Sequence, residues 1–348
     1  MSNVRVGTSG WHYPTGRGRW DGVFYPARRG RGTTFDELAY YAAHFDTVEV
    51  NSTFYGQPRA EVTRGWAGRT PAGFEFSVKL YQKFTHPEMF KGRLRRAAGV
   101  TPGRKRARGV ASGDGARTFA SGGGTPPDGL LDALVRPNGA DIDEFKRGID
   151  PLADAGKLGA LLAQFPPSFK NGDAERAYLA DLLRAFSVYP VAVELRHRSW
   201  SDGLAGTLAL LDAFEAAFVQ IDEPKFRFSI RQNHLPNVRG FYYMRLHGRN
   251  AANWWRHEKA EDRYDYLYSA DELKELTDIA GAARELVKKV YMYANNHFSA
   301  KSVANAAMIK HQLGEQVEGE YPEAFVTRYP ELRSVVKQRS ATAERRLV

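Results

Sequence analysis

Charged side chains follow apolar, strand-like segments at several points of this sequence. In VAVELRHRSW (191–200), Glu194 and Arg196 are two residues apart, so in an extended strand both point to the side that Ala192 occupies. Similar alternation ends other segments in Glu49 and in Arg245. Carboxylates beside guanidinium groups can bind an anion and move a proton next to it. We therefore expect these segments to end at one chemically active pocket.

We predict roles for the polar residues that share this pattern. As catalytic residues we expect Glu49, Glu194, Asp222 and His247. As substrate-binding residues we expect Trp11, Asn51, Lys79, Gln164, Arg196, Arg245, Tyr293 and Asn295. The planar fork of arginine matches phosphate or carboxylate, so Arg196 and Arg245, with Lys79, would hold an anionic group. Glu194 or Asp222 would act as general base or metal ligand, and His247 as the acid.

These residue types leave other functions open. Glu49 and Glu194 could serve as the carboxylate pair of a glycosidase or an isomerase. The pocket could also belong to a nucleic-acid or sugar-phosphate binding module without catalysis, or hold only a closed network of ion pairs. The carboxylates with His247 could ligate Mg or Mn, whereas zinc sites usually need more than the two histidines, His247 and His297, found near strand ends.

The elements that must position these residues alternate along the chain. Eight segments read as strands: 4–10, 47–53, 74–80, 159–165, 191–196, 218–223, 241–248 and 290–296. Between and after them lie segments with helical periodicity: 35–45, 61–69, 142–156, 174–186, 204–215, 270–288 and 299–313. The connection 224–239 shows no clear helix. Alternating strands and helices indicate parallel pairing, and eight strands indicate a single (β/α)8 TIM-type barrel.

Such a barrel makes a demand on side-chain parity. One parity of each strand fills the interior, and the residues that end it line the active-site mouth. Seven strands end in polar residues of one parity, whereas the opposite parity is mostly apolar. The inward sets that we predict are Glu49 and Asn51, Ser77 and Lys79, Gln164, Glu194 and Arg196, Gln220 and Asp222, Arg245 and His247, and Tyr293 and Asn295. We expect the barrel domain to span residues 1–320, followed by a basic tail at 321–348.

Several ordered blocks of sequence resemble the YecE-like family, whose members carry a domain of unknown function 72. The blocks include VGTSGWHYPTGRGRWDGVFYP, LAYYAAHFDTVEVNSTFYGQP, FEFSVKLYQKFTH, LGALLAQFPPSF, VAVELRHRSW, YYMRLHGRN and YMYANNHFSAKSVANA, and they cover roughly residues 4–310. The resemblance implies a TIM-type barrel, distantly similar in fold to xylose isomerase and endonuclease IV. It implies no activity, so function must be argued from the site. A segment near 97–140 is longer than the family pattern.

Charge and composition narrow the class of protein. The net charge of +10 is concentrated in residues 93–127, which carry +7, and in residues 337–348, which carry +3. The sequence has no cysteine, which excludes disulfides and thiolate chemistry. It has no apolar run of membrane-spanning length and no secretory leader, so we expect a cytoplasmic protein. We expect an enzyme acting on an anionic, phosphate-bearing substrate, either a small molecule or nucleic acid, by phosphoester or backbone hydrolysis.

The basic segment 97–128 generates a first test. Its Arg and Gly content and scarcity of apolar residues predict a disordered insertion after the third strand. The insertion could contact polyanions, or it could be a solubilising segment without a partner. Deleting it should leave the melting temperature nearly unchanged and weaken binding to single-stranded nucleic acid, measured by fluorescence anisotropy at two salt concentrations. A large loss of stability would show that the segment is packed, and unchanged binding would remove the partner.

Overall fold

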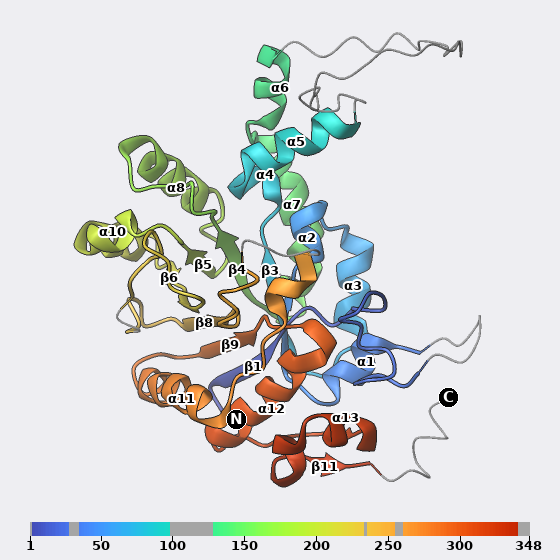
Figure 1. The fold of residues 1–348 in the computed structure, drawn as a ribbon. Coiled ribbons are helices and arrows are strands. Elements are labelled where there is room, and N and C mark those ends of the chain that lie inside the picture. The colour runs from blue at the N-terminus through green and yellow to red at the C-terminus, as the bar shows by residue number, and fades with distance from the viewer. Residues whose placement is uncertain (1, 28–34, 98–127, 233–234, 255–259, 340–348) are drawn as a thin grey trace, which may run out of the picture.

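Strands form at all eight predicted segments, because each combines β-branched or aromatic residues with a period of two. The computed structural model describes residues 2–27, 35–97, 128–232, 235–254 and 260–339. Nine parallel strands curl into a nearly closed barrel with helices between them (Figure 1), which confirms the predicted fold class. Of the insertion predicted at 97–128, residues 98–127 lie outside the described residues, whereas residues 97 and 128 belong to helices.

The barrel strands follow the chain around the sheet, with one division. They are β1 (Val4–Ser9), β2 (Thr47–Val50), β3 (Glu75–Lys79), β4 (Leu158–Gln164), β5 (Val191–Glu194), β6 (Ala217–Phe218), β7 (Gln220–Asp222), β8 (Tyr242–Leu246) and β9 (Val290–Ala294). Neighbours pair in the order β6-β5-β4-β3-β2-β1-β9-β8-β7. The predicted sixth strand is therefore two short strands, β6 on β5 and β7 on β8.

Between β6 and β7, side chains from the connection 224–239 form hydrogen bonds with backbone N–H and carbonyl groups of the strand. The N–H of Val219 still donates to Val193 of β5 at 3.0 Å. Gln232 accepts from the Ile221 N–H at 2.9 Å and donates to the Val219 carbonyl, and Asn237 accepts from the Phe218 N–H at 2.7 Å. The connection needs no helix to close the barrel, and no helix occurs in its described residues.

Helices surround the strands, and the seven predicted helical segments are confirmed. Short helices at the carboxyl ends of β2, β3 and β5 were not predicted, and they shape the mouth of the barrel. The helices are α1 (Glu37–Ala42), α2 (Ser52–Tyr55), α3 (Ala60–Gly68), α4 (Gln82–Thr85), α5 (Pro87–Ala97), α6 (Asp128–Val135), α7 (Gly139–Asp154), α8 (Asp173–Ala185), α9 (Ser199–Asp202), α10 (Leu204–Asp212), η1 (Ala260–Tyr264), α11 (Ala270–Arg284), η2 (Phe298–Ala300), α12 (Lys301–Gln312), α13 (Glu323–Arg328) and η3 (Pro330–Ser334). Among the described helices, none is long and apolar enough to cross a membrane.

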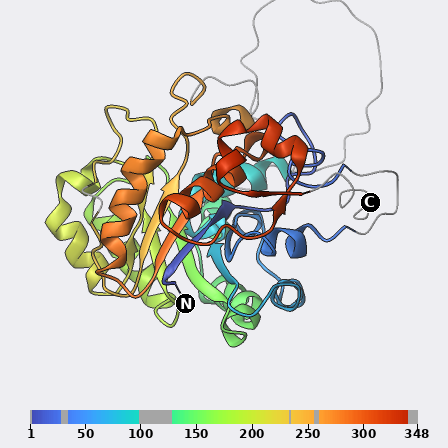
Figure 2. The same cartoon turned by 90° about the horizontal axis from the view of Figure 1, so that it is seen from below.

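The prediction of a tail beginning at residue 321 is wrong. Strands β10 (Glu320–Tyr321) and β11 (Lys337–Gln338) pair in parallel, with α13 and η3 between them. Tyr321 and Phe325 are fully buried, and the Phe325 ring lies 5.7 Å from Phe24. Figure 2 shows these red C-terminal elements beside the blue N-terminal part of the chain. We predicted a tail because residues 337–348 are basic, and we gave too little weight to the aromatic residues that precede them. Residues 340–348 lie outside the described part of the chain.

Tyrosines fill the barrel below its mouth, and their hydroxyl groups all find partners. Tyr243 donates to Glu49 at 2.9 Å, Tyr291 bonds with Glu75, and Tyr293 lies 2.7 Å from the Thr47 hydroxyl. Buried polar groups must be paired to avoid a desolvation cost. The barrel interior is therefore packed with hydrogen-bonded tyrosines, and the charged residues of the mouth lie directly above them.

The contact between α7 and the chain before α3 generates a stability test. A Cβ atom at Gly148 would lie 2.1 Å from the Pro58 carbonyl oxygen, so Gly148→Ala must displace α7, the helix that leads into β4. We expect a loss of about 1–3 kcal/mol in the free energy of unfolding.

Gly65→Ala is the matched control, because nothing lies within 4 Å of its added Cβ. Gly65 is helical and exposed, so this change should stabilise by about 0.5–1 kcal/mol. Urea titration of both variants measures the difference; equal stabilities would contradict the packing.

Candidate functional site

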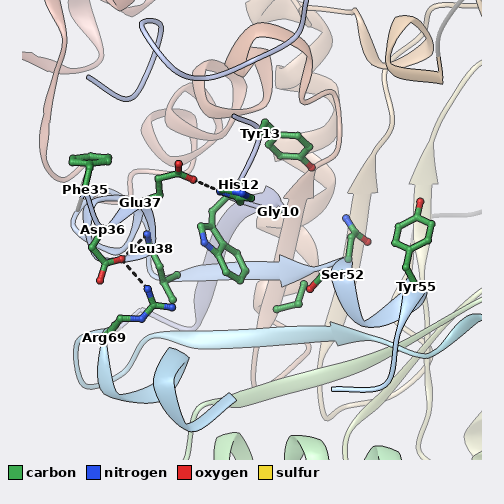
Figure 3. Close-up of a pocket in the computed structure, with 13 residues that line it drawn as sticks. Gly10, His12, Tyr13, Phe35, Asp36, Glu37, Leu38, Ser52, Tyr55 and Arg69 are labelled. Atoms are coloured by element: carbon green, nitrogen blue, oxygen red, sulfur yellow. Dashed lines mark hydrogen bonds and ion pairs between the residues drawn. The ribbon is translucent and has the colours of Figure 1, made fainter. Parts of the chain in front are cut away.

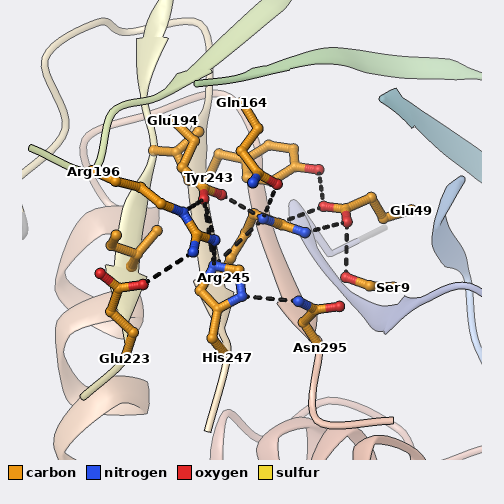
Figure 4. A network of polar contacts seen from close by, with 12 residues as sticks. Ser9, Glu49, Gln164, Glu194, Arg196, Glu223, Tyr243, Arg245, His247 and Asn295 are labelled. Atoms are coloured by element: carbon orange, nitrogen blue, oxygen red, sulfur yellow. Dashed lines mark hydrogen bonds and ion pairs between the residues drawn. The ribbon is translucent and has the colours of Figure 1, made fainter. Parts of the chain in front are cut away.

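Arg245 is the centre of the charged cluster at the carboxyl end of the barrel (Figure 4). Its Nε and Nη2 atoms donate to the two oxygens of Glu49 at 2.8 and 2.6 Å. Its Nη1 donates to Glu194 and, at 3.2 Å, to Gln164. Arg245 is 1% exposed and both glutamates are 0% exposed. One guanidinium group therefore ties together β2, β4, β5 and β8.

Strand register explains why these residues meet. Residues paired across parallel strands face the same side of a sheet. The register pairs Ser9 with Glu49 and Gln164 with Glu194, and places Arg245 opposite Tyr293. The inward parity predicted for these strands is confirmed.

Arg196 extends the cluster toward the mouth and binds a residue that we did not predict. Its guanidinium lies 2.6 Å from Glu194 and 3.3 Å from Glu223. Glu223 is buried and follows β7 directly. Its position could have been found from the sequence, because Val219, Ile221 and Glu223 form an alternating set that is apolar until its end.

The predicted parity of the sixth strand is wrong. Ile221, rather than Gln220 or Asp222, pairs with Arg245 and therefore shares its side of the sheet. Asp222 instead binds Arg249, with a shortest distance of 3.0 Å, and accepts from the Tyr268 hydroxyl at 2.7 Å. A shift of one residue reverses the face of every side chain in a strand. Asp222 is thus outside the cluster that Arg245 organises.

The carboxylates that we considered as metal ligands do not meet at one point. Glu49 and Glu194 both bind Arg245, whereas Asp222 binds Arg249. Within the residues that the structure describes, no group of three or more acidic or histidine side chains is arranged to hold a metal ion. The geometry of these carboxylates matches guanidinium partners.

The carboxylate of Glu194 is held in its charged form. Burial would raise its pKa, but the guanidinium groups of Arg196 and Arg245 outweigh burial and keep the pKa well below its ordinary value. A carboxylate with a low pKa is a weak base. The expected role of Glu194 as a general base therefore lacks the basicity that it needs near neutral pH.

His247 is a neutral acceptor at the edge of the cluster. Its Nε2 lies 3.0 Å from Nη2 of Arg196, and its Nδ1 lies 2.8 Å from the Asn295 amide nitrogen. Burial, followed by the charge of Arg196, lowers its pKa to about 3. The imidazole is therefore uncharged at neutral pH, and the role of acid that we predicted for His247 would have to use its neutral form.

Above the cluster, a cavity of about 260 Å³ opens at the mouth. It brings together most of the predicted substrate-binding residues but not the glutamates beneath them. Tyr293 is not among its lining residues, since its hydroxyl is bonded deeper in the barrel. The lining includes the cations Lys79, Arg196, Arg245 and Arg263, the amides Asn51, Gln164 and Asn295, and the rings of Tyr13, Phe54, Tyr55, Tyr264 and His297.

Lys79 differs from the other cations of this cavity. Its Nζ lies 4.3 Å from the centre of the Phe54 ring. Among the described residues, Lys79 has no hydrogen bond or ion pair with a side chain of opposite charge. Burial, followed by the charge of Arg245, lowers its pKa to about 7. Lys79 is therefore the group in the cavity that changes protonation near neutral pH.

A second cavity, of about 570 Å³, adjoins the first (Figure 3). Both are lined by Tyr13, Asn51 and Tyr55. Trp11, predicted to bind substrate, lines only the second cavity. There His12 Nδ1 lies 2.6 Å from the buried carboxylate of Glu37.

The lowered pKa of His247 gives a dependence of stability on pH. The ordinary value is 6.5 and the folded value is about 3, so below pH 6.5 the unfolded chain binds a proton that the folded chain does not. The free energy of unfolding should therefore fall as pH decreases through this window, by about 1.4 kcal/mol per pH unit for each such group. His247→Gln should reduce this slope between pH 6 and 4.5, measured by urea titration. His311→Gln, at an exposed position, should leave the slope unchanged. A slope equal to that of the wild type in His247→Gln would show that His247 is not held neutral.

Comparisons with known proteins agree with this architecture. UPF0759 protein YunF of Bacillus subtilis is 24% identical over 330 residues, which cover 92% of this chain and 98% of that protein. A crystal structure of a DUF72 family protein from Thermotoga maritima is 30% identical, with a TM-score of 0.66 over 90% of this chain and 99% of its own. One from Enterococcus faecalis is 21% identical, with a TM-score of 0.68 over 91% and 98%. The family model described as "Protein of unknown function DUF72" matches residues 5–327, and the chain therefore belongs to the DUF72 family.

Proposed function

We propose that the mouth cavity binds a small phosphate-bearing molecule and that the protein is an enzyme that transfers a proton at this ligand. The observation that carries the proposal is Lys79, a cation that lines the cavity without a carboxylate partner among the described residues. An ammonium group in such a place is stabilised when an anion enters. The proposal therefore rests on an unbalanced positive charge at the mouth.

Arg196 and Arg245 contribute to phosphate binding to different degrees. The charge of Arg245 is balanced by Glu49 and Glu194, and Arg196 is shared between Glu194 and Glu223. Arg196 is still 14% exposed and lines the cavity. A phosphate beside Lys79 would thus meet a guanidinium that is already oriented by its carboxylates. Preorganised donors of this kind lose little freedom when the ligand binds.

The walls of the cavity set the kind of molecule that fits. Phe54, Tyr55 and Tyr264 present rings beside the cations. At about 260 Å³ the cavity suits a small molecule or the end of a longer one. The adjoining cavity, with Trp11, offers room for a ring. A phosphate attached to a sugar or a base matches this combination.

Proton transfer in this cavity would use Lys79. From the sequence we expected a carboxylate base and a histidine acid for phosphoester hydrolysis. Glu194 is held ionised with a low pKa, His247 is neutral, and Asp222 lies elsewhere. A pKa near 7 lets Lys79 accept or release a proton at neutral pH. Hydrolysis of a phosphoester would therefore proceed with Lys79 as the group that exchanges the proton.

The carbohydrate alternative lacks the same support. A glycosidase needs two carboxyl groups that face the scissile bond. Glu49 and Glu194 do not line the cavity, and both accept hydrogen bonds from Arg245. A binding module would use the same cavity, so only a measurement of turnover distinguishes it from an enzyme.

Titration with inorganic phosphate tests the proposed anion site. We expect saturable binding by calorimetry that weakens about tenfold or more in Lys79→Met, because a hydrogen bond to a charged group contributes about 1.5–3 kcal/mol. Lys274→Met removes the same charge from the exposed face of α11 and should bind as the wild type does. Glu194→Gln removes a negative charge from beneath the cavity and should strengthen binding. Equal affinities in Lys79→Met and Lys274→Met would place the phosphate elsewhere.

The enzymatic part of the proposal needs a separate measurement. Phosphate release from a panel of sugar phosphates, nucleotides and short oligonucleotides, with and without Mg or Mn, would reveal hydrolysis. Turnover that disappears in Lys79→Met supports the proton-transfer role. Tight phosphate binding without turnover of any phosphorylated compound would favour the binding module.

A further inference from the structure

We propose that Lys79 is an amine nucleophile that forms an imine with the carbonyl carbon of a phosphate-bearing aldehyde or ketone. This inference rests on the proposed function, because a phosphate held by Arg196 in the mouth cavity would place the carbonyl group beside the amine. It names the substrate class as phosphorylated carbonyl compounds and gives Lys79 a covalent role.

The backbone of Lys79 is fixed at the mouth. Lys79 ends β3 on the inward side, and its carbonyl oxygen accepts from the Thr53 hydroxyl at 2.6 Å. The next residue, Leu80, donates its N–H to Leu162 of β4 at 2.9 Å. The Phe54 ring beneath the ammonium limits the directions that the side chain can take. An amine held on a rigid strand can meet a bound carbonyl carbon repeatedly in one geometry.

The groups around Lys79 favour its neutral, nucleophilic form. Burial acts first, and charges from other elements follow. A free lysine would have only about one amine in 3,000 neutral at pH 7, whereas a pKa of about 7 leaves about half in that form. Lysines desolvated beside another cation are a recognised type of enzymatic nucleophile. The charged and titratable groups that face Lys79 are Arg245 of β8, Arg196 after β5, Glu194 of β5, Glu49 of β2 and His86 after α4.

Two buried lysines, Lys83 and Lys157, lack this combination. Lys83 binds both oxygens of Asp141, at 2.9 and 2.7 Å. Lys157 donates to three oxygens of Ala67 and Thr70, at 2.6 to 3.0 Å. Both ammonium groups are held by oxygens of the protein, and neither lysine lines the mouth cavity. They are therefore internal controls for reactivity.

The covalent step balances without an oxidant or a reductant. The Nζ lone pair of Lys79 adds to the carbonyl carbon, and a proton passes from nitrogen to the carbonyl oxygen to give a carbinolamine. The nitrogen then forms the C=N bond while the hydroxyl group leaves with a second proton as water. Tyr55 and Tyr264 line the cavity and carry hydroxyl groups that can relay this proton. The products are one imine and one water.

Gln164 is placed to assist this addition. Its side-chain oxygen accepts from Arg245 at 3.2 Å, so its NH₂ group remains to donate to a ligand. Gln164 and Arg196 both line the cavity that contains the amine. A donor directed at the carbonyl oxygen stabilises the negative charge that develops there during attack.

Reductive trapping with pyridoxal 5′-phosphate tests the inference, since this reagent is a phosphate-bearing aldehyde. After borohydride reduction, peptide mass spectrometry should find Lys79 modified at least tenfold faster than Lys83 or Lys157. The rate should rise with pH around a midpoint near 7. Inorganic phosphate should protect Lys79, and pyridoxal without phosphate should react more slowly. Lys79→Arg should lose the modification, because a guanidinium group is not a nucleophile near neutral pH.

The outcomes separate this inference from the proposed function. If Lys79 reacts no faster than Lys83 and Lys157, while phosphate binding still depends on it, the nucleophile is refuted and the phosphate site stands. If Lys79 reacts fastest but pyridoxal matches its phosphate and inorganic phosphate gives no protection, the nucleophile stands and the phosphate site is refuted.

Discussion

The ion pairs of Arg245 with Glu49 and Glu194 are the constraint on which the mouth of this barrel depends. These three charged side chains have almost no exposure, and removing one partner from a buried pair typically costs about 3–5 kcal/mol. Glu49 and Glu194 come from strands far apart in the sheet order, so one guanidinium group fixes their spacing across the interior. The hydroxyls of Tyr243 and Ser9 also bind Glu49. The cluster therefore forms the floor of the cavity.

This floor determines which groups remain available for chemistry. Glu49 and Glu194, which we predicted to be catalytic, bind Arg245 and lie beneath the cavity surface, and arginine holds Glu194 ionised. His247, bonded to Asn295 and beside Arg196, is held neutral. What remains at the surface is cationic, amide or aromatic. An anion completes such a surface better than a neutral sugar does.

Sequence reasoning predicted the eight-strand plan and most of the site, because alternation of apolar and polar residues directly reports the two faces of a strand. It failed at 218–223, where two parities are equally plausible: one ends in Asp222 and the other in Glu223. Pairing of Ile221 with Arg245 decides between them, and pairing is set by tertiary structure. The packed residues 320–338 were missed because their nearby positive charge outweighed, in our prediction, the aromatic residues at 321 and 325.

The sequence also predicted the position of Lys79 but not its chemical state. Burial is the largest cause of the lowered pKa of Lys79, and the charge of Arg245 follows. Glu49 and Glu194 oppose both effects, but neither forms an ion pair with Lys79. Arg245 occupies both glutamates and adds a positive charge of its own, so it acts against the ammonium form in two ways. Phe54 offers a ring face, a weaker partner than a carboxylate. Arg245, which stabilises the interior, therefore also helps to keep the pKa of Lys79 near 7, where its charged and neutral forms are both populated.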